Sequence, residues 1–398
     1  MREQLGYGNP ASAVRTVTAV TVLFLLAAVP AGAQQEAPVI ENGFSGSMRD
    51  APTLVEKAVA GAEGPEEALL FRPTNIMFDP DGNLYVADSG QHAILVYGRD
   101  GGFKARFGRE GDGPGEFRMP AVSYFSWDGE LVVEDPGNQR RSFLSTEGDF
   151  LRSESLGPVF MSGTPIPTVT GEYIRPGQGG VVVRMAAGPG GMQSMQNDED
   201  APGLVEVIDS AGEVKLKIGT RREHENRMIG TLINRTSIAY APPDHVVACF
   251  SVLNEIHVYN KNTGQLERII TRRLAFNPKE PEMGTRTEST TDAGGGRRTM
   301  IQAIPDIDPI SDCVAVDREG RIWVLTHLTT SEAADEKEAE GEFDGLIRIE
   351  VFSLEGELLT AIPLDFAPSM IAFDPLGDLW LVDTRDTLSA RRYQVRWP

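Results

Sequence analysis

The chain has 398 residues, with 58 Asp and Glu against 37 Lys and Arg, and a formal net charge of −21. Such an acidic chain repels the phosphates of nucleic acids and of anionic lipids, which argues against both as partners. Two cysteines, Cys249 and Cys313, are too few for a disulfide scaffold. Each lies in an apolar run typical of a buried free thiol, although a single bridge between them remains open in an oxidising compartment.

The first segment has the pattern of an export signal. Arg2 and Arg15 precede an apolar run, Val17–Val29, that is too short to span a bilayer. Ala31–Ala33 then supplies the small residues that a signal peptidase requires. We therefore expect residues 1–33 to be a signal peptide and residues 34–52 an N-terminal extension. The mature protein is expected to be soluble in the periplasm or outside the cell, without stable membrane insertion; an uncleaved N-terminal anchor is the alternative.

One eleven-residue pattern recurs along the rest of the chain. It reads FDPDGNLYVAD at Phe78–Asp88, FSWDGELVVED at Phe125–Asp135 and FDPLGDLWLVD at Phe373–Asp383, with a weaker copy, VDREGRIWVLT, at Val316–Thr326. Each copy joins the end of an apolar segment to a β-branched and aromatic strand through a turn, where glycine supplies the positive φ. Repetition at intervals of a few tens of residues indicates one supersecondary unit that is stacked several times.

A second glycine turn completes most of these units. It lies between strand-like runs such as ILVY and IEVF, and its glycines are Gly101, Gly148, Gly212, Gly264 and Gly356. Each unit therefore has four antiparallel strands, a to d, joined as a meander, which is the blade of a β-propeller. The units begin near residues 74, 121, 167, 236, 312 and 369. The sequence thus predicts an all-β, six-bladed β-propeller over residues 53–398.

The last unit has only three strands of its own, Ser369–Phe373, Leu379–Val382 and Ser389–Arg396. Near the start of the chain, Thr53–Ala60 forms a strand without a blade. The stretch after it, GAEGPEEALLFRP, mirrors GREGDGPGEFRMP, which follows strand d of the first unit. We therefore expect Thr53–Ala60 to be strand d of the last blade, so that the ring closes and leaves no open sheet edge. Two separate β domains are the alternative.

The copies resemble the NHL-type repeat of six-bladed β-propellers. The resemblance lies in the G-x-L-Y/W-V-x-D strand and in the segments that follow it, ADSGQHAILVY at 87–97 and EDPGNQRRSFL at 134–144. It is good in the first two units, fair in the last and poor in the third to fifth. It implies a fold and little about function, because propellers of this kind include both binding modules and enzymes.

Three long insertions are expected at one end of the propeller. In a meander the a–b and c–d turns lie at one end, which we call the tight-turn face, and the b–c and d–a loops lie at the other, the insertion face. Ala186–Gly203 and Thr329–Gly345 fall in b–c loops, and Asn277–Ile310 is a d–a loop. Loops of this length are usually functional or disordered. Their compositions favour partial disorder, whereas their common placement favours function over neutral drift.

Arginines gather on the insertion face, while many carboxylates fall on the tight-turn face. The candidate ligand-binding residues are Arg72, Arg118, Arg235, Arg140 and Arg385. The first three precede strand a at positions that their spacing makes equivalent, and they should ring the mouth of the central channel. A ring of guanidinium groups suits a carboxylate, phosphate or sulfate. The alternative is that these arginines pair with Glu116, Asp135 and the acidic insertions.

Metal sites are a weaker hypothesis. Three histidines map to loops on the insertion face, His92, His224 and His327. Histidines from separate loops could hold zinc, but none of these has a ligand spacing such as H-x-H, and solvated loop histidines are the alternative. Asp88, Asp135 and Asp383 end strand b in three blades, where they could hold calcium or cap the b–c turn. We favour capping.

The sequence therefore predicts an exported, non-catalytic propeller that needs no cofactor and binds a protein partner or a small anionic ligand through its insertion face. No G-x-S-x-G, H-E-x-x-H or P-loop motif is present. The alternative is a metal-dependent, lactonase-like hydrolase or a lyase with a single zinc or calcium ion at the channel mouth. Sugar-lactone propellers resemble this chain in blade count, but the Glu, Asn and Asp that hold their metal find no match in it. A third interpretation is a cell-envelope scaffold whose acidic loops meet a basic subunit.

Overall fold

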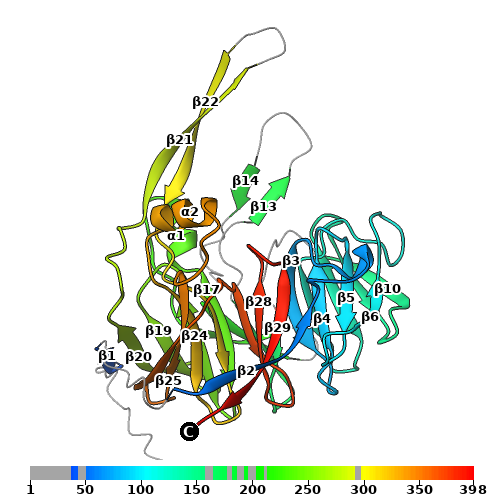
Figure 1. Cartoon of the computed structure of the whole chain (residues 1–398), viewed down its shortest axis with the longest axis horizontal. Helices are drawn as coiled ribbons and strands as arrows, with labels where there is room; N and C mark the ends of the chain where they lie inside the picture. The colour runs from blue at the N-terminus through cyan, green and yellow to red at the C-terminus, as the bar shows by residue number, and fades with distance from the viewer. Residues whose placement is uncertain are drawn as a thin grey trace, which may run out of the picture. The chain divides into compact units, whose positions relative to one another are not determined.

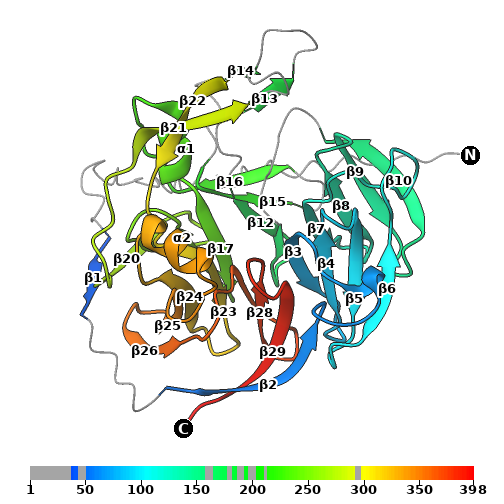
Figure 2. The same ribbon diagram turned by 45° about the horizontal axis from the view of Figure 1, so that its top comes forward.

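The computed structural model describes residues 37–43, 51–156, 165–176, 182–185, 192–195, 203–209, 213–291 and 297–398. The predicted signal peptide, residues 1–33, lies outside these ranges. Within them, the strands form six antiparallel blades arranged in a ring (Figures 1 and 2), which confirms the predicted β-propeller. No helix in this part of the chain is both long enough and apolar enough to cross a membrane.

The blades follow one another along the chain, and the strands of each blade run from the innermost outward. Blade one contains β3 (Pro73–Phe78), β4 (Leu84–Asp88), β5 (Ala93–Tyr97) and β6 (Phe103–Phe107). Blade two contains β7 (Val122–Phe125), β8 (Leu131–Asp135), β9 (Arg140–Leu144) and β10 (Phe150–Ser155). Blade three contains β11 (Ile166–Pro167), β12 (Tyr173–Pro176), β15 (Val205–Ile208) and β16 (Val214–Ile218).

The second half of the ring repeats the same order. Blade four contains β17 (Thr236–Ala241), β18 (His245–Phe250), β19 (Ile256–Asn260) and β20 (Leu266–Arg272). Blade five contains β23 (Ser311–Val316), β24 (Ile322–His327), β25 (Ile347–Phe352) and β26 (Leu358–Pro363). Blade six contains β27 (Met370–Phe373), β28 (Leu379–Asp383), β29 (Ser389–Arg396) and, from the start of the chain, β2 (Thr53–Ala60).

The strand β2 closes the ring as predicted. It pairs antiparallel with β29, from Thr53 opposite Arg396 to Ala60 opposite Ala390. A second contact supports its role as strand d of blade six. A Cβ on Gly101, in the c–d turn of blade one (φ +83°), would lie 2.3 Å from the Val59 carbonyl oxygen. Gly148 approaches strand d of blade one in the same way, so each of these turns needs glycine to pack against the outer strand of the preceding blade.

The N-terminal extension contains one strand that the sequence did not predict, β1 (Val39–Asn42). It adds to blade four as a fifth strand, parallel to β20. Asn42 then reaches blade five, where its Nδ2 donates to the Gly356 carbonyl at 3.0 Å and its Oδ1 accepts from the Leu358 amide at 2.8 Å. Because β2 belongs to blade six, β1, Asn42 and β2 together contact three successive blades.

The hydrophobic core lies between neighbouring blades. Trp380 of blade six, for example, packs in one cluster with Leu84 of blade one, and both are fully buried. Burying a large apolar side chain contributes roughly 1.5–3 kcal/mol. The described residues place no comparable cluster between blades two and three. There the ring of Tyr173 contacts those of Tyr124 and Trp127, with centroids 6.1 and 5.1 Å apart.

Both cysteines are free thiols. Cys249 is buried in β18, and Cys313 lies in β23, where its Sγ is 3.6 Å from the Ser237 hydroxyl. Burial raises the pKa of both thiols. A buried thiol of raised pKa is a poor nucleophile. The interpretation as a buried free thiol is therefore confirmed for Cys249, whereas Cys313 is a free thiol that is only partly buried, and no disulfide joins the two in the structure.

The predicted insertions all lie on the insertion face (Figure 1, top). Of the first, Ala186–Gly203, the structure describes only residues 192–195 and 203; there β14 (Met192–Met195) pairs with β13 (Val182–Met185), which precedes the insertion. The second contains a longer hairpin of β21 (Glu282–Thr291) and β22 (Arg297–Asp306). The third contains a helix, α2 (Ser331–Ala339), which begins after the capping residue Thr330. The expected disorder is therefore wrong for α2 and for β21 and β22. Two shorter helices, a 3-10 turn at Glu66–Ala68 and α1 (Arg227–Ile233), lie in d–a connections.

Candidate functional site

The connection from β6 to β7 forms a compact loop, residues 108–121, on the insertion face. Phe117 anchors it, because its side chain is fully buried and its amide donates to the Arg109 carbonyl at 2.8 Å. The Glu116 carboxylate closes the loop by accepting from the Gly113 amide at 2.8 Å and from Arg109 Nε at 2.9 Å. These two donors hold the pKa of Glu116 below its usual value. The loop thus gives Arg118 a fixed backbone.

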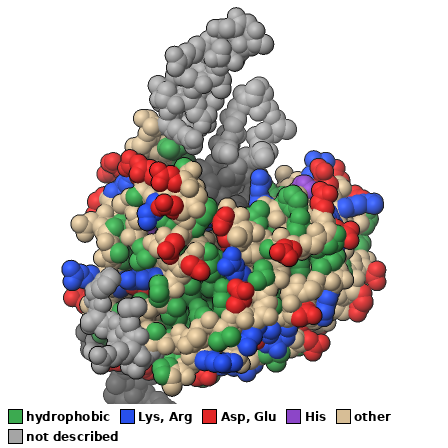
Figure 3. Space-filling model, viewed as in Figure 1, with side chains coloured by type: hydrophobic (Ala, Val, Ile, Leu, Met, Phe, Trp, Pro, Cys, Tyr) green, Lys and Arg blue, Asp and Glu red, His purple; other side chains and the backbone are tan. Residues whose placement is uncertain are grey.

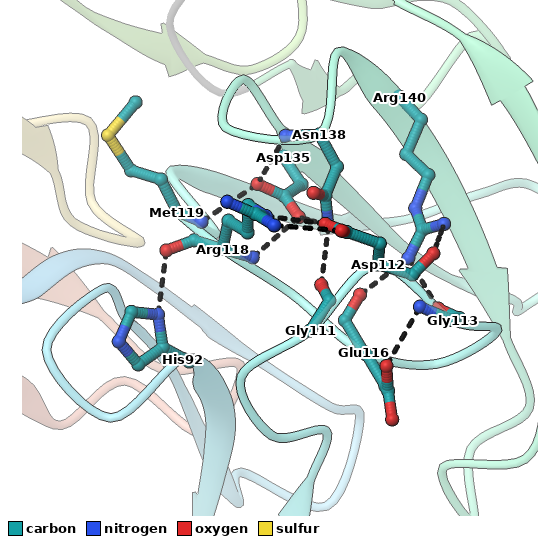
Figure 4. Close-up of polar contacts among 10 residues, drawn as sticks. All are labelled: His92, Gly111, Asp112, Gly113, Glu116, Arg118, Met119, Asp135, Asn138 and Arg140. Carbon is teal, nitrogen blue, oxygen red and sulfur yellow. Dashed lines mark hydrogen bonds and ion pairs between the residues drawn. The ribbon is translucent and has the colours of Figure 1, made fainter.

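Arg118 and Arg140 both bind Asp112 of this loop, from opposite sides (Figure 4). Arg118 forms a two-pronged ion pair with Asp112, from Nε to Oδ1 and from Nη2 to Oδ2, the latter at 2.8 Å. The Arg140 guanidinium donates to the carbonyls of Asp112, Gly113 and Glu116 at 2.8, 2.6 and 2.6 Å. A cavity of about 320 Å³ is lined by Asp112, Arg118, Gly137, Asn138, Gln139 and Arg140.

Arg118 is the residue of this cavity that is best placed to bind an anion. Its side chain is 57% exposed and that of Asp112 is 66% exposed, so their ion pair faces water and contributes little to stability. A carboxylate or phosphate from outside could therefore replace Asp112 in the same two-pronged geometry. Arg140, by contrast, is hydrogen-bonded to three backbone carbonyls and holds the loop together.

Asp135, fully buried at the end of β8, fixes the backbone beside the cavity through hydrogen bonds. Its Oδ2 accepts from the Arg118 amide at 2.9 Å, and its Oδ1 accepts from the Met119 amide at 2.8 Å. Asn138 of the b–c turn donates from Nδ2 to the same carboxylate at 2.8 Å. One side chain thus fixes both the b–c turn and the backbone that presents Arg118.

The other two aspartates at the ends of strand b are used in a similar way. Asp88 accepts from the amides of Gly90 and Gln91 in its own turn, and from two amides of the d–a connection. Asp383 accepts from the amides of Arg385, Asp386 and Thr387. These bonds confirm the prediction that the strand-b aspartates cap the b–c turns.

The same bonds correct the predicted correspondence of the arginines. In blade one the strand-b aspartate binds the amides of Phe71 and Arg72, and in blade two it binds those of Arg118 and Met119. Phe71 is therefore the equivalent of Arg118, and the prediction that Arg72 and Arg118 are equivalent is wrong by one residue. Arg235 does share the Arg72 position, because each carbonyl accepts the amide that follows strand b. Successive residues of an extended segment point in opposite directions, so the three arginines do not form one ring.

The remaining arginines differ in how far they are engaged. Arg72 and Arg235 are exposed, and neither side chain makes a hydrogen bond or an ion pair with another residue in the described ranges. Arg385 is engaged: its Nη1 lies 2.8 Å from Glu338 Oε1 of α2, and its Nη2 lies 3.5 Å from Asp312 Oδ2 of β23. Arg385 lies in the b–c turn of blade six, so it ties that blade to the third insertion and to β23 of blade five.

The three candidate histidines lie in different surroundings. His92 Nδ1 is 2.7 Å from the Arg118 carbonyl, and His224 Nδ1 is 3.1 Å from the carbonyl two residues on. His327 is buried, with Nε2 2.9 Å from Asp312 Oδ1. No group of three or more His, Cys, Asp or Glu side chains that could hold a metal ion occurs within the described ranges. The metal-dependent alternative thus finds no ligand set in this part of the chain.

The capping carboxylate of Asp383 gives a prediction about pH. Burial alone would raise its pKa, but the amide hydrogen bonds from Arg385, Asp386 and Thr387 outweigh burial and hold the pKa below its usual value. Such a carboxylate stabilises the fold above its unfolded-state pKa of about 3.9, and that contribution is lost as the pH falls through the lower folded-state pKa. We expect the free energy of unfolding to decline as the pH falls below about 4, and Asp383→Asn to reduce the decline. Urea unfolding of both proteins from about pH 7 down to about pH 3 measures this; equal declines would contradict it.

Two partners in the cavity were not anticipated from the sequence. Asp112 is one of many surface acids, and its pairing with Arg118 depends on how the loop folds back on itself. Asn138 follows a buried aspartate by three residues, a spacing typical of an Asx turn, and this signal could have identified it.

Comparisons with known proteins identify the fold and no family. No protein-family model matches the sequence, and no curated protein matches it. Among solved structures, the chain is similar to an exported protein from Bacteroides fragilis, with a TM-score of 0.54 and 11% identity over 91% of this chain and 100% of that one. It is also similar to a DUF4221 member from Bacteroides vulgatus, with a TM-score of 0.54 and 10% identity over 88% and 99% of the two chains. At such identities the similarity shows the propeller fold alone.

Proposed function

We propose that the chain is an exported, non-catalytic propeller, built of NHL-type repeats, that holds a protein partner through its insertion face. The observation that carries the proposal is the hairpin β21–β22. Its two ten-residue strands pair only with each other among the described residues, from Glu282 opposite Asp306 to Thr291 opposite Arg297. An isolated two-stranded hairpin is marginally stable in water. A projecting hairpin of this length is therefore best explained by a partner that packs against it.

The base of the hairpin is firmly attached to the rest of the insertion face. Lys279 Nζ contacts Asp306 Oδ1 at 2.5 Å. Asp308 accepts from the Lys279 amide at 3.0 Å, and from the amide and hydroxyl of Ser331, at the start of α2, at 2.8 and 3.0 Å. The second and third insertions thus share one anchoring carboxylate, and a partner that binds the hairpin also meets α2.

The charge on α2 suggests the chemistry of the partner. Glu332, Asp335, Glu336 and Glu340 lie on or directly after this helix, on the side of it that faces water, and Figure 3 shows acidic side chains gathered over it. A basic surface on the partner would complement them. Arg118, nearer to blade two, adds a site for one carboxylate of the partner. Recognition by separated charges of this kind affects specificity and association rate more than affinity.

Excision of the hairpin tests the proposal. A variant in which a two-residue turn replaces residues 284–304 keeps Lys279, Asp306 and Asp308. It should melt within a few degrees of the natural protein, because β21 and β22, the parts of the hairpin that the structure describes, pair with no blade. We expect it to lose at least about tenfold in affinity for the envelope protein that the natural chain retains on a column, since truncating the centre of an interface removes most of its binding energy. Retention is measured by quantitative pull-down and then by titration of the recovered partner.

Two triple variants, one that neutralises acids of α2 on the insertion face and one that neutralises acids on the tight-turn face, test the role of charge; the second is the matched control. The variant Glu332→Gln, Asp335→Asn, Glu336→Gln should bind the partner more weakly and with less dependence on salt. Three equal changes on the tight-turn face, at Asp81, Asp128 and Glu355, should leave binding unchanged. If the hairpin-excised protein retains the partner fully, or the tight-turn face proves to be the sensitive one, the proposal fails.

A further inference from the structure

A second cavity lies on the outer part of the insertion face, beside blade four. It has a volume of about 430 Å³, within the range of small-ligand pockets. Its lining comes from the b–c turn of blade four and from the segment that leaves β20 toward β21, namely Asn254, Arg273, Leu274, Ala275, Phe276, Asn277 and Pro278. It shares no lining residue with the Arg118 cavity.

The back wall of this cavity is fixed by hydrogen bonds. The Arg273 amide donates to the Asn42 carbonyl of β1 at 3.0 Å, and Asn254 Nδ2 donates to the Arg272 carbonyl at 2.6 Å. The buried Arg272 side chain points into the protein, so that of Arg273, the next residue, points out to solvent. The cavity is thus a pre-formed feature in which Arg273 is presented by a rigid backbone.

Three kinds of group face a ligand in this cavity. The Arg273 guanidinium makes no hydrogen bond or ion pair with another residue in the described ranges, so it is free to bind an anion in two-pronged fashion. Leu274, Phe276 and Pro278 are half-buried and contribute apolar atoms to a lining that is otherwise largely polar. Asn254 Oδ1 is buried without a hydrogen-bond partner among the described residues, and the bond from Nδ2 fixes which way the amide lies. An acceptor in this state favours a ligand that brings an N–H or O–H.

We propose that this cavity binds the C-terminal end of a peptide whose last side chain is apolar. The terminal carboxylate pairs with Arg273, the last side chain packs on Phe276 and Leu274, and the last amide N–H lies toward Asn254. A phosphate would leave the apolar side chains of the lining without a contact, and a simple fatty acid would leave Asn254 Oδ1 unpaired. The inference rests on the proposed function, because it names the part of a protein partner that would be recognised.

Fluorescence anisotropy with two peptides tests the inference. The first is a fluorescein-labelled pentapeptide that ends in leucine with a free carboxylate, and the second is the same peptide with a C-terminal amide. We expect the free acid to bind at least about tenfold more tightly than the amide, and Arg273→Gln to abolish that difference. Lys57→Gln, which removes an exposed positive charge from β2, is the control and should bind like the natural protein.

The outcomes separate this inference from the proposed function. The hairpin-excised protein keeps every residue of the cavity and should bind the free-acid peptide normally. Equal binding of acid and amide, or an unchanged difference in a folded Arg273→Gln protein, would overturn the inference while leaving the hairpin as the partner site. Tight binding of fluorescein-labelled hexanoate would likewise overturn it, because a fatty acid has no amide for Asn254.

Discussion

A protein that begins at Gly61, and therefore lacks β2, is expected to lose its cooperative unfolding transition and to aggregate. Without β2, the eight-residue strand β29 becomes an exposed sheet edge, and such edges pair with other chains. The turn at Gly101 also loses the strand against which it packs. Because a domain is stable by only about 5–15 kcal/mol, loss of a whole ladder and of one blade contact should leave no folded ring. Circular dichroism melts and size-exclusion chromatography measure both effects.

Two further variants make this test specific to closure. In the first, residues 53–60 are appended to the Gly61 protein after Pro398, through an Asn-Gly turn. This is feasible because β2 already runs antiparallel to β29 with Thr53 opposite Arg396. We expect this rearranged chain to recover a single sharp transition. A protein that lacks only residues 34–43 should lose the β1 contacts, including those of Asn42, and still fold, with its midpoint lowered by a few degrees. A Gly61 protein that melted like the full chain would contradict the role of β2.

The ring was predictable because its signals are local and repeated. The glycine turns at Gly82 and Gly101 require a positive φ, and the apolar strands between them have the length and composition of buried strands. The role of Thr53–Ala60 followed from the missing outer strand of the last blade. These features depend on chemistry within one blade, which the sequence displays directly.

The parts that could not be predicted depend on contacts between distant segments. Val39–Asn42 has no periodicity that marks a strand, and only the exposed outer edge of β20 gives it a partner. The one-residue shift of Arg118 arises from the loop that precedes β7, whereas the spacing alone suggested equivalence with Arg72. The Thr, Gly and Arg content of Gly284–Arg298, within the insertion Asn277–Ile310, favoured partial disorder, yet β21 and β22 form a regular ladder there. In each case tertiary pairing outweighs local composition.

Replacing Glu350 by alanine is expected to lower the free energy of unfolding by about 3–5 kcal/mol. Glu350 and Arg272 lie between blades five and four with side chains that are each only 1% exposed, and Arg272 Nε is 3.0 Å from Glu350 Oε2. The Nε hydrogen is not directed at the carboxylate, so charge holds the pair together. Glu350 also accepts from Thr326 Oγ1 at 2.8 Å and from Arg348 Nε at 3.1 Å. Its removal takes this counter-charge from two guanidinium groups, those of Arg272 and Arg348, of which that of Arg272 is the more deeply buried.

A matched surface pair and a double variant separate this mechanism from simple loss of contacts. Glu338→Ala removes the 2.8 Å partner of Arg385, where both side chains are 27% exposed, and should cost only about 0.2–1 kcal/mol. Adding Arg272→Met to Glu350→Ala removes the more deeply buried of the two charges and should restore part of the lost stability, because apolar replacements of buried ion pairs are often neutral. Urea unfolding of the four proteins measures these differences. A double variant less stable than Glu350→Ala would show that the lost stability comes from packing and not from the isolated charge. In that case the buried pair itself would stabilise the contact between blades four and five.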